Sequence, residues 1–494
     1  MASGSYIVEV SWDGNTSTFV HANSDVTTHT FQVECSRGRD VASQLTGHSE
    51  PGRCQIILNN QSGRYNSYNA TGSLFGSLLP GRLVQIRTTA PTAGTLWRGY
   101  ITSIRPGPSV KNVDTAVIEA QGPLGHINQK DISPVILSNV NTGVIIGTLL
   151  DAAGWPGTGT VASAFRDIDA GITTVVTFVH ARDKPMGIIR KVEETESGFI
   201  RESNDGKIVF ENRQRRGKPP FETSQAVFTD SPTGTLAYSE IEQEEPLSFV
   251  FNELVTAIQQ FTTGSTSTLW KLPSSLAGVN SVIPGGGSRV FVASYPNPTA
   301  TANAIGVFLW TTPTATVDYN LFIDSGGTGS NMNGSVARTV VDNVNELEIT
   351  LNNTSTVLAY VVGPSATGIA LQARGVPLLR DDPLIIPKRD SASEARFGKR
   401  TAPIHGGFVP NVQEGVDWTD WNAAVFGDPT PRFSIGFVAN RSTAHLTQAI
   451  LRDVSDRIRL VATGTTNNLG VNADFFIEKV EHKIDSDRTH SVKY

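Results

Sequence analysis

The side chains that could carry out catalysis are few and scattered in this chain of 494 residues. The acidic residues 240–246 could supply the paired carboxylates of a glycosidase, but four glutamates in so short a stretch are typical of a solvated face. Residues 166–171 resemble the start of a calcium-binding loop and lack the glutamate that its twelfth position requires. The sequence also lacks the motifs of zinc hydrolases, serine esterases and phosphate-binding loops. We therefore expect no enzymatic activity, no catalytic residue, no metal and no cofactor.

Histidine and tryptophan offer two further possibilities. His482 alternates with Val480 and Ile484 near the end of the chain, and we interpret it as a strand-surface residue rather than a ligand. Trp418 and Trp421 could stack on a sugar ring, but an aromatic pair beside turns is more typical of a core or an interface.

Composition narrows the class of protein. Cys35 and Cys54 are the two cysteines of the chain, too few for a disulfide framework. We expect two reduced, partly buried thiols, with a single bridge between them as the alternative. The net charge of −6 argues against a basic nucleic-acid-binding domain. The first residues lack the basic and apolar regions of a signal peptide, and no window approaches the roughly 18 apolar residues of a spanning helix, so we expect no membrane insertion.

Five arginines fall on two hairpins of similar design at the two ends of the chain. Residues 80–106 predict two alternating strands around a loop, and residues 455–484 repeat this plan. The arginines are Arg82, Arg87 and Arg98 in the first hairpin and Arg457 and Arg459 in the second. Two similar units suggest two copies of one β-domain.

The elements around these hairpins predict a mainly β chain with four parts. Residues 1–128 carry six short strands of a barrel or sandwich. Residues 129–245 form a small α+β segment, with helices at 141–156 and 183–198 and a hairpin that turns at 204–206. Residues 246–385 predict about seven strands of an immunoglobulin-like β-sandwich, inserted before the final part at 386–494.

Several stretches resemble bacteriophage tail hub and tail-tip proteins, the baseplate hub-like minor tail proteins. They are SRGRD (36–40), IILNNQSGRYN (56–66), LFGSLLPGRLVQIR (74–87) with LWRGYITSI (96–104), DSASEARFGKR (390–400), and the closing SDRIRLV with DFFIEKVEHKI. The resemblance implies that residues 1–128 and 386–494 form two tube-type β-barrel domains. It also implies a homotrimer in which six barrels form a ring.

The function implied by this resemblance is that of a structural virion protein at the tail tip, assembled in the host cytoplasm. A trimeric hub would join the tail tube to the tip and form part of the genome-conducting channel. Its partners would be a tail tube or distal tail protein ring, the tape measure protein and a central tip or spike protein, with DNA only in transit. The five arginines become candidates for contacts to neighbouring barrels or to the lumen, the alternative being ordinary solvated charges. The other open function is a host-glycan-binding tail adhesin that uses the β-sandwich.

Overall fold

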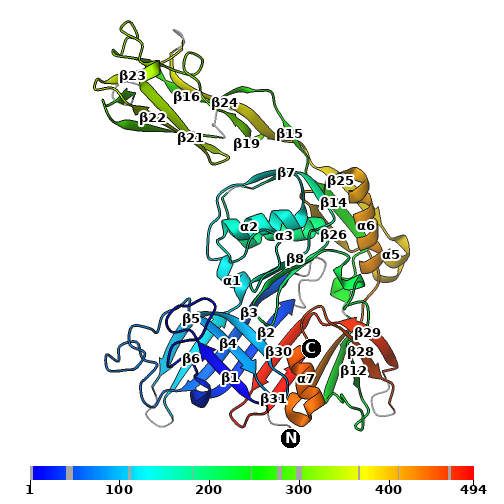
Figure 1. Ribbon diagram of the computed structural model, residues 1–494. Helices are drawn as coiled ribbons and strands as arrows, with labels where there is room; N and C mark the ends of the chain where they lie inside the picture. Colours follow the sequence, from blue (N-terminus) through cyan, green and yellow to red (C-terminus); the bar gives the residue numbers. More distant parts are fainter. Residues whose placement is uncertain are drawn as a thin grey trace.

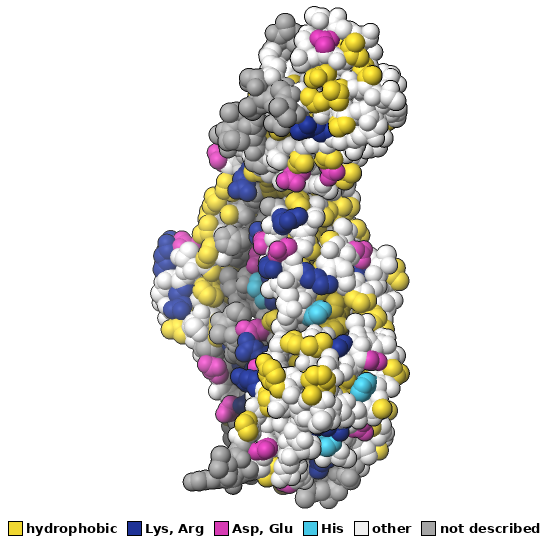
Figure 2. Space-filling model, turned by 90° about the vertical axis from the view of Figure 1, so that its left-hand side faces the viewer, with side chains coloured by type: hydrophobic (Ala, Val, Ile, Leu, Met, Phe, Trp, Pro, Cys, Tyr) yellow, Lys and Arg dark blue, Asp and Glu magenta, His cyan; other side chains and the backbone are white. Residues whose placement is uncertain are grey.

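Strands dominate the computed structural model, which describes residues 4–39, 48–108, 113–180, 182–245, 247–274, 281–295, 303–364, 368–409, 411–464 and 469–494. The molecule is elongated, with a base of packed sheets, a middle layer that contains helices, and a separate lobe at one end (Figure 1). A narrow neck joins this lobe to the rest (Figure 2). The prediction of a mainly β chain is confirmed.

A ten-stranded sheet forms much of the base. Its strand order is β1-β4-β5-β6-β3-β2-β30-β31-β27-β13, so strands from the start of the chain continue directly into strands from its end. β2 and β30 form the junction, where Val33 pairs with Ile484 and Gly38 with Lys479. The strands are β1 (Tyr6–Val10), β2 (Thr30–Arg39), β3 (Ser49–Asn59), β4 (Leu83–Thr88), β5 (Gly94–Gly107), β6 (Thr115–Gln121), β13 (Glu240–Glu244), β27 (Arg432–Val438), β30 (Lys479–Ile484) and β31 (His490–Lys493).

One face of this sheet is buried. In β1, Tyr6, Val8 and Val10 are buried while the residues between them are partly exposed, as the two-residue period of a strand requires. The buried face packs against α7 (Thr443–Leu451) and against a three-stranded sheet of β12 (Ala226–Thr229), β28 (Arg457–Ala462) and β29 (Val471–Phe476).

The first predicted hairpin is confirmed, and the second is correct only in its first strand, because residues 455–484 form three strands instead of two. The first is the antiparallel pair β4 and β5, and the second is the pair β28 and β29. Neither sheet closes on itself among the described strands. The two tube-type barrels therefore remain a prediction.

The middle layer contains helices and short strands from residues 123–211, and the bounds 129–245 of the α+β segment remain a prediction. Its elements are α1 (Pro123–Ile127), β7 (Ile136–Asn141), α2 (Thr142–Ala152), β8 (Arg166–Ile168), β9 (Thr174–Val179), α3 (Pro185–Glu196), β10 (Phe199–Glu202) and β11 (Ile208–Glu211). Both predicted helices are confirmed. Pro185 opens α3, where its missing N–H costs nothing. In α2, Val144 points outward with 41% of its surface exposed, while Ile145 and Ile146 face the core.

The separate lobe, for which the sequence predicts a β-sandwich, is built on its own apolar core. Its strands are β15 (Phe261–Thr263), β16 (Ser267–Pro273), β17 (Val282–Ile283), β18 (Ser288–Ser294), β19 (Ala304–Thr311), β20 (Asn320–Phe322), β21 (Val336–Asp342), β22 (Glu346–Asn353), β23 (Ala359–Val362) and β24 (Ile369–Arg380). They form three small sheets.

A further small sheet lies between the lobe and the base. β14 (Glu253–Ile258), which the sequence assigns to the sandwich, pairs instead with β25 (Leu384–Arg389) and β26 (Thr401–Gly406). Two helices, α5 (Ser391–Phe397) and α6 (Val412–Phe426), belong to this region. β14 and β25 therefore belong to the support of the sandwich and not to its core. Among the described helices, none has the length and apolar character needed to cross a membrane.

Candidate functional site

The outward face of the ten-stranded sheet is a continuous polar surface, which we call the polar face. It crosses the junction between β2 and β30 and includes Glu34, Ser36, Arg53, Gln55, Glu119, Gln121, Glu240, Glu481, Lys483, Ser491 and Lys493. These residues line a groove of about 900 Å³. Strands from both ends of the chain thus build one shared surface, which no single stretch of sequence encodes.

Charges of both signs alternate on the polar face. Lys479 lies 2.6 Å from Glu481, and Lys493 lies 3.4 Å from Glu242 on β13. Such exposed pairs contribute little to stability, about 0–1 kcal/mol each. Because the lysines are paired with glutamates, the polar face carries no strong positive potential. Strong nucleic-acid binding needs uncompensated Lys and Arg, so we do not expect it on this surface.

Three of the five predicted arginines have carboxylate partners within the chain. Arg87 makes a two-pronged contact with Glu9, with nitrogen–oxygen distances of 2.7 and 2.9 Å. Arg459 donates to Asp474 at 2.7 Å, and Arg457 lies 3.4 Å from the same carboxylate. Contacts of these arginines to a neighbouring subunit or a lumen remain a prediction.

The other two arginines have no ion pair among the described residues. Arg82 precedes β4, and its Nε is buried without a hydrogen-bond partner. Arg98 donates weakly to the carbonyl oxygens of Thr16 and Ser17, at 3.4 and 3.5 Å. Of the five predicted arginines, these two are therefore the ones that could still bind a carboxylate from another molecule.

The interpretation of His482 as a strand-surface residue is wrong. His482 is buried, and its Nδ1 lies 3.0 Å from Nε2 of His490, whose Nδ1 lies 2.8 Å from the Tyr6 hydroxyl oxygen. The reason is parity, since His482 shares a face of β30 with the buried Val480 and Ile484. Burial lowers the pKa of His490 to about 3 and is the main cause of the lowered pKa of His482. Both rings are consequently neutral structural groups.

The two cysteines are free and buried, and they face each other directly. Cys35 of β2 is paired with Cys54 of β3 in the antiparallel register. Burial is the main cause that raises the pKa of the Cys54 thiol, which makes it a poor nucleophile.

The remaining candidates for chemistry have structural places. Asp167 and Asp169 are both paired with Arg215, at 2.7 and 2.6 Å, rather than open to a cation. The glutamates of β13 lie on an exposed sheet edge. Trp421 on α6 is exposed, whereas Trp418 packs against a small apolar cluster. Among the described residues, no group of histidine, cysteine or acidic side chains is arranged to hold a metal ion.

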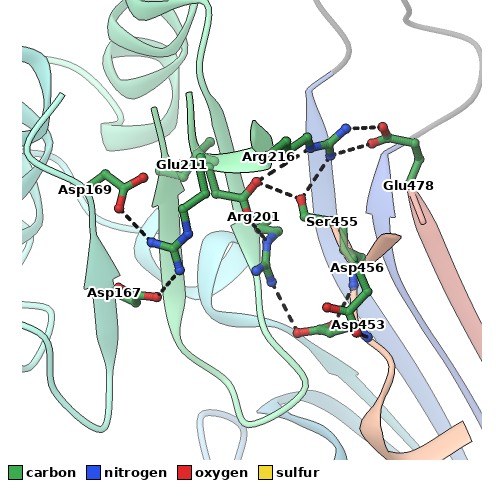
Figure 3. A network of polar contacts seen from close by, with 12 residues as sticks. Asp167, Asp169, Arg201, Glu211, Arg216, Asp453, Ser455, Asp456 and Glu478 are labelled. Carbon is green, nitrogen blue, oxygen red and sulfur yellow. Dashed lines mark hydrogen bonds and ion pairs between the residues drawn. The ribbon is translucent and has the colours of Figure 1, made fainter. Parts of the chain in front are cut away.

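A network of buried charges joins the base to the middle layer, and the sequence gives no local sign of it (Figure 3). Arg201 of β10 donates to Glu211 of β11 at 2.6 Å and to Asp453 at 3.2 Å. Asp453, in the turn between α7 and β28, also accepts from Arg37 of β2 at 2.7 Å. One carboxylate thus connects three parts of the chain that are far apart in sequence.

The network continues on the other side of Glu211. This carboxylate accepts from the Ser455 hydroxyl at 2.7 Å, and Arg216 bridges Ser455 and Glu478. Ser455 has φ of +75°, a conformation that non-glycine residues adopt at a cost. The hydrogen bonds on both sides of its hydroxyl hold it there. We call this network the buried joint between the base and the middle layer, and directional polar contacts hold it.

Comparison with solved structures identifies the fold. No protein-family model matches the chain, and no curated protein sequence does. The tail protein from Neisseria meningitidis MC58 superposes with a TM-score of 0.50 at 8% identity, over 99% of this chain and 95% of that one. The protein has the phage tail-protein fold. The resemblance seen in the sequence is confirmed at this level.

Two further tail proteins are similar over most of their length. The 43 kDa tail protein of prophage MuSo2 from Shewanella oneidensis gives a TM-score of 0.49 at 8% identity, over 99% of this chain and 97% of that one. Prophage tail protein gp18 from Listeria monocytogenes EGD-e gives 0.41 at 8% identity, over 99% and 93%.

Proposed function

We propose that this protein is a non-enzymatic structural component of a phage tail, and that three copies form a hub at the tail tip. In this hub the polar face lines part of the channel through which the genome passes. The hub would contact the tail tube or distal tail protein ring, the tape measure protein and a central spike.

The observation that carries this proposal is the junction between β2 and β30. Strands from the start of the chain, which include the first predicted hairpin, and strands from its end merge there into one ten-stranded sheet with a polar outer face. A wide sheet of this kind can supply two adjacent segments of a ring wall. Three such chains would then supply six segments of a closed three-fold ring.

The proposal is tested by imaging the purified protein and by measuring the mass of its assembly. A trimer of 52.9 kDa chains has a mass of about 159 kDa in mass photometry, and class averages of electron micrographs should show a three-fold ring around a channel. If the trimer assembles only on a neighbouring ring, it would be seen in intact tails instead of in the purified protein. A single copy per tail, or a ring without a central opening, would refute the hub.

The polar face gives a second prediction of the same proposal. Because its charges are balanced, a short duplex DNA should not bind the protein measurably at physiological salt. Reversing Glu34, Glu119 and Glu481 to lysine should create salt-sensitive DNA binding and slow DNA ejection from virions. Tight binding by the parent protein would contradict a channel surface that lets DNA pass.

A further inference from the structure

The two cysteines of the chain form one cross-strand pair in the base. Cys35 of β2 lies directly opposite Cys54 of β3, and these two strands run side by side (Figure 1). Both side chains point into the core and are 3% exposed. Burial, and then a hydrogen bond with the Cys35 thiol, raise the pKa of the Cys54 thiol. The two sulfur atoms are therefore within hydrogen-bonding distance of each other.

The backbone hydrogen bonds around this pair define its geometry. The N–H of Arg39 on β2 donates to β30. Because the polar backbone groups of a strand alternate in direction, those of Cys35, an even number of residues before Arg39, also point to β30. On β3, the carbonyl oxygen of Gly52 accepts from Gly122 beyond β6, so the polar backbone groups of Cys54 point to β6. Neither cysteine is therefore bonded to the other through its backbone.

Cys35 and Cys54 thus occupy a non-hydrogen-bonded position of the antiparallel ladder. The Cβ atoms of such a pair are about 4.5 Å apart, against about 5.5 Å in a hydrogen-bonded pair. A disulfide spans a Cβ–Cβ distance of about 3.5–4.5 Å. The register therefore places the two cysteines where a disulfide can join the strands without moving them apart or together.

A metal site would be the other use of two thiols beside a histidine. His482 lies opposite Cys35 on β30, but its Nδ1 is directed to His490, at 3.0 Å. In the part of the chain that the structure describes, no group of histidine, cysteine and acidic side chains is placed to hold a metal ion. The geometry of the pair fits oxidation better than metal binding.

We propose that Cys35 and Cys54 are a redox-sensitive pair, which becomes a cross-strand disulfide when the protein meets a low-molecular-weight disulfide as oxidant. The thiolate of one cysteine attacks a sulfur of the oxidant, which forms a mixed disulfide and releases one thiol. The second cysteine then attacks the cysteine sulfur of the mixed disulfide and releases the other thiol. The pair loses two electrons and two protons in total, and the oxidant is reduced to two thiols.

Burial makes this reaction slow and its product stable. The oxidant reaches the sulfurs only when β2 opens from β3, because both side chains are buried. The raised pKa of Cys54 lowers the fraction of thiolate and slows the attack further. The same raised pKa favours the disulfide at equilibrium, since the reduced pair is not stabilised as a thiolate.

The disulfide would fix the strand that joins the two parts of the ten-stranded sheet. β2 is bonded to β3 on one side and to β30 on the other. Closing a loop of about 20 residues should lower the opening of β2 from β3 roughly a hundredfold. The occasion for oxidation rests on the proposed function, because a tail component passes from a reducing cytoplasm to an oxidising exterior when virions are released. The chemistry of the pair does not depend on that function.

The test is an incubation of the purified full chain in buffers with different ratios of oxidised to reduced glutathione. Samples are unfolded at intervals in the presence of iodoacetamide, and intact mass and non-reducing peptide maps are recorded. A parallel series contains urea below the unfolding transition, which speeds the opening of β2 from β3. The single variants Cys35→Ser and Cys54→Ser each retain one thiol.

A matched control moves the pair by one residue along the same two strands. It carries Glu34→Cys and Gln55→Cys in a chain with Cys35→Ser and Cys54→Ser. Glu34 and Gln55 are opposite each other and exposed, but they occupy a hydrogen-bonded position. The control thiols are therefore more accessible and less well placed.

We expect the parent to lose the mass of two hydrogen atoms and to yield a peptide linked through Cys35 and Cys54, without a glutathione adduct. Hydrogen–deuterium exchange in β2 and β3 should then slow roughly a hundredfold, with no change in β22 of the sandwich. The single variants should show no such slowing. The control pair should need a glutathione ratio about tenfold or more higher for half oxidation, because its disulfide is strained.

Three results would overturn the inference. Free thiols that persist in the urea series, or a stable glutathione adduct on either cysteine, would mean that the two sulfurs do not join. Oxidation of the control pair at the same glutathione ratio would mean that the register does not select Cys35 and Cys54. None of these results affects the hub proposal, which depends on the number of copies. A parent that forms the disulfide but is a single copy in intact tails would refute the hub and leave the redox pair in place.

Discussion

Asp453 is the most connected carboxylate of the buried joint, and its removal gives the sharpest test of how the joint is held. Replacing it by alanine leaves Arg37 and Arg201 without their shared anion. Their side chains are 2% and 7% exposed, so water cannot replace the lost partner. Breaking a buried ion pair in this way costs about 3–5 kcal/mol.

The structure places Asp453→Ala near the lower end of this range. Arg37 keeps its hydrogen bond to the Leu96 carbonyl oxygen at 2.7 Å, and Arg201 keeps Glu211. We therefore expect a loss of about 3 kcal/mol in the free energy of local opening, which is about two orders of magnitude in the opening constant. Asp453→Asn should cost less, because it retains an acceptor for Arg37.

Hydrogen–deuterium exchange is the suitable assay, since it reports local opening where a chain of several parts does not unfold in one step. Peptides that cover β10 and β11 should exchange faster in Asp453→Ala, while peptides from β22 in the sandwich should not change. The control is Glu119→Ala, which removes an exposed partner of Arg105 and should change stability by less than about 1 kcal/mol. Equal effects of the two variants would refute the reasoning.

The same variant has a predicted pH dependence. Burial raises the pKa of Asp453, but Arg37 and Arg201 more than offset this effect and hold the pKa below its ordinary value. A carboxyl group with a depressed pKa in the folded state stabilises above its unfolded pKa of about 3.9. The contribution is lost as pH falls through the folded value. The difference between parent and variant should therefore be constant near neutrality and shrink in acid.

Three further predictions concern other parts of the chain. Burial raises the pKa of Glu202 to about 7, although hydrogen bonds from the backbone N–H groups of Leu124 and Gly52 lower it. The protonated side chain therefore stabilises the fold in acid, and this contribution is lost as pH rises through neutrality. Glu202→Gln should remove this dependence, and an equal difference in melting temperature between parent and variant at pH 5.5 and at pH 8 would contradict the prediction. Cys35 and Cys54 should resist iodoacetamide in the native protein and react after unfolding, as mass spectrometry would show; rapid native labelling would mean that β2 and β3 open easily. Replacing residues 261–380 by a short Gly/Ser bridge should leave a soluble protein with the parent's oligomeric state. A wider deletion of residues 243–388 should not, because it removes β14 and nearly all of β25 and leaves β26 without its sheet; equal solubility of both in gel filtration would refute this boundary.

The local elements of the fold could be predicted from the sequence because their signals are local. Helix α3 starts at a proline and ends at a residue in the left-handed conformation, and the hairpin of β10 and β11 turns at Gly206, whose φ is +80°. Alternation predicts both strands of the first arginine hairpin and the first strand of the second. These signals depend on neighbours within a few residues.

The pairing of distant strands could not be predicted in this way. Nothing in the alternation of β2 specifies that Val33 lies beside Ile484, because any strand with the same period would satisfy the pattern. For the same reason β14 was assigned to the sandwich, although its partners begin at residues 384 and 401. The burial of His482 is different, since it follows from its parity with Val480 and Ile484 and could have been predicted.

The roles of the arginines show where sequence reasoning ends. Residue type and strand position select Arg82, Arg87, Arg98, Arg457 and Arg459, but the function of each depends on whether a carboxylate lies opposite it. Glu9 and Asp474 supply that partner for three of them, and a satisfied arginine has little to offer another subunit beyond its flat face. Arg82 has no carboxylate partner among the described residues, and its Nε is buried without a hydrogen-bond partner, so its guanidinium keeps the capacity to bind a carboxylate from outside the chain.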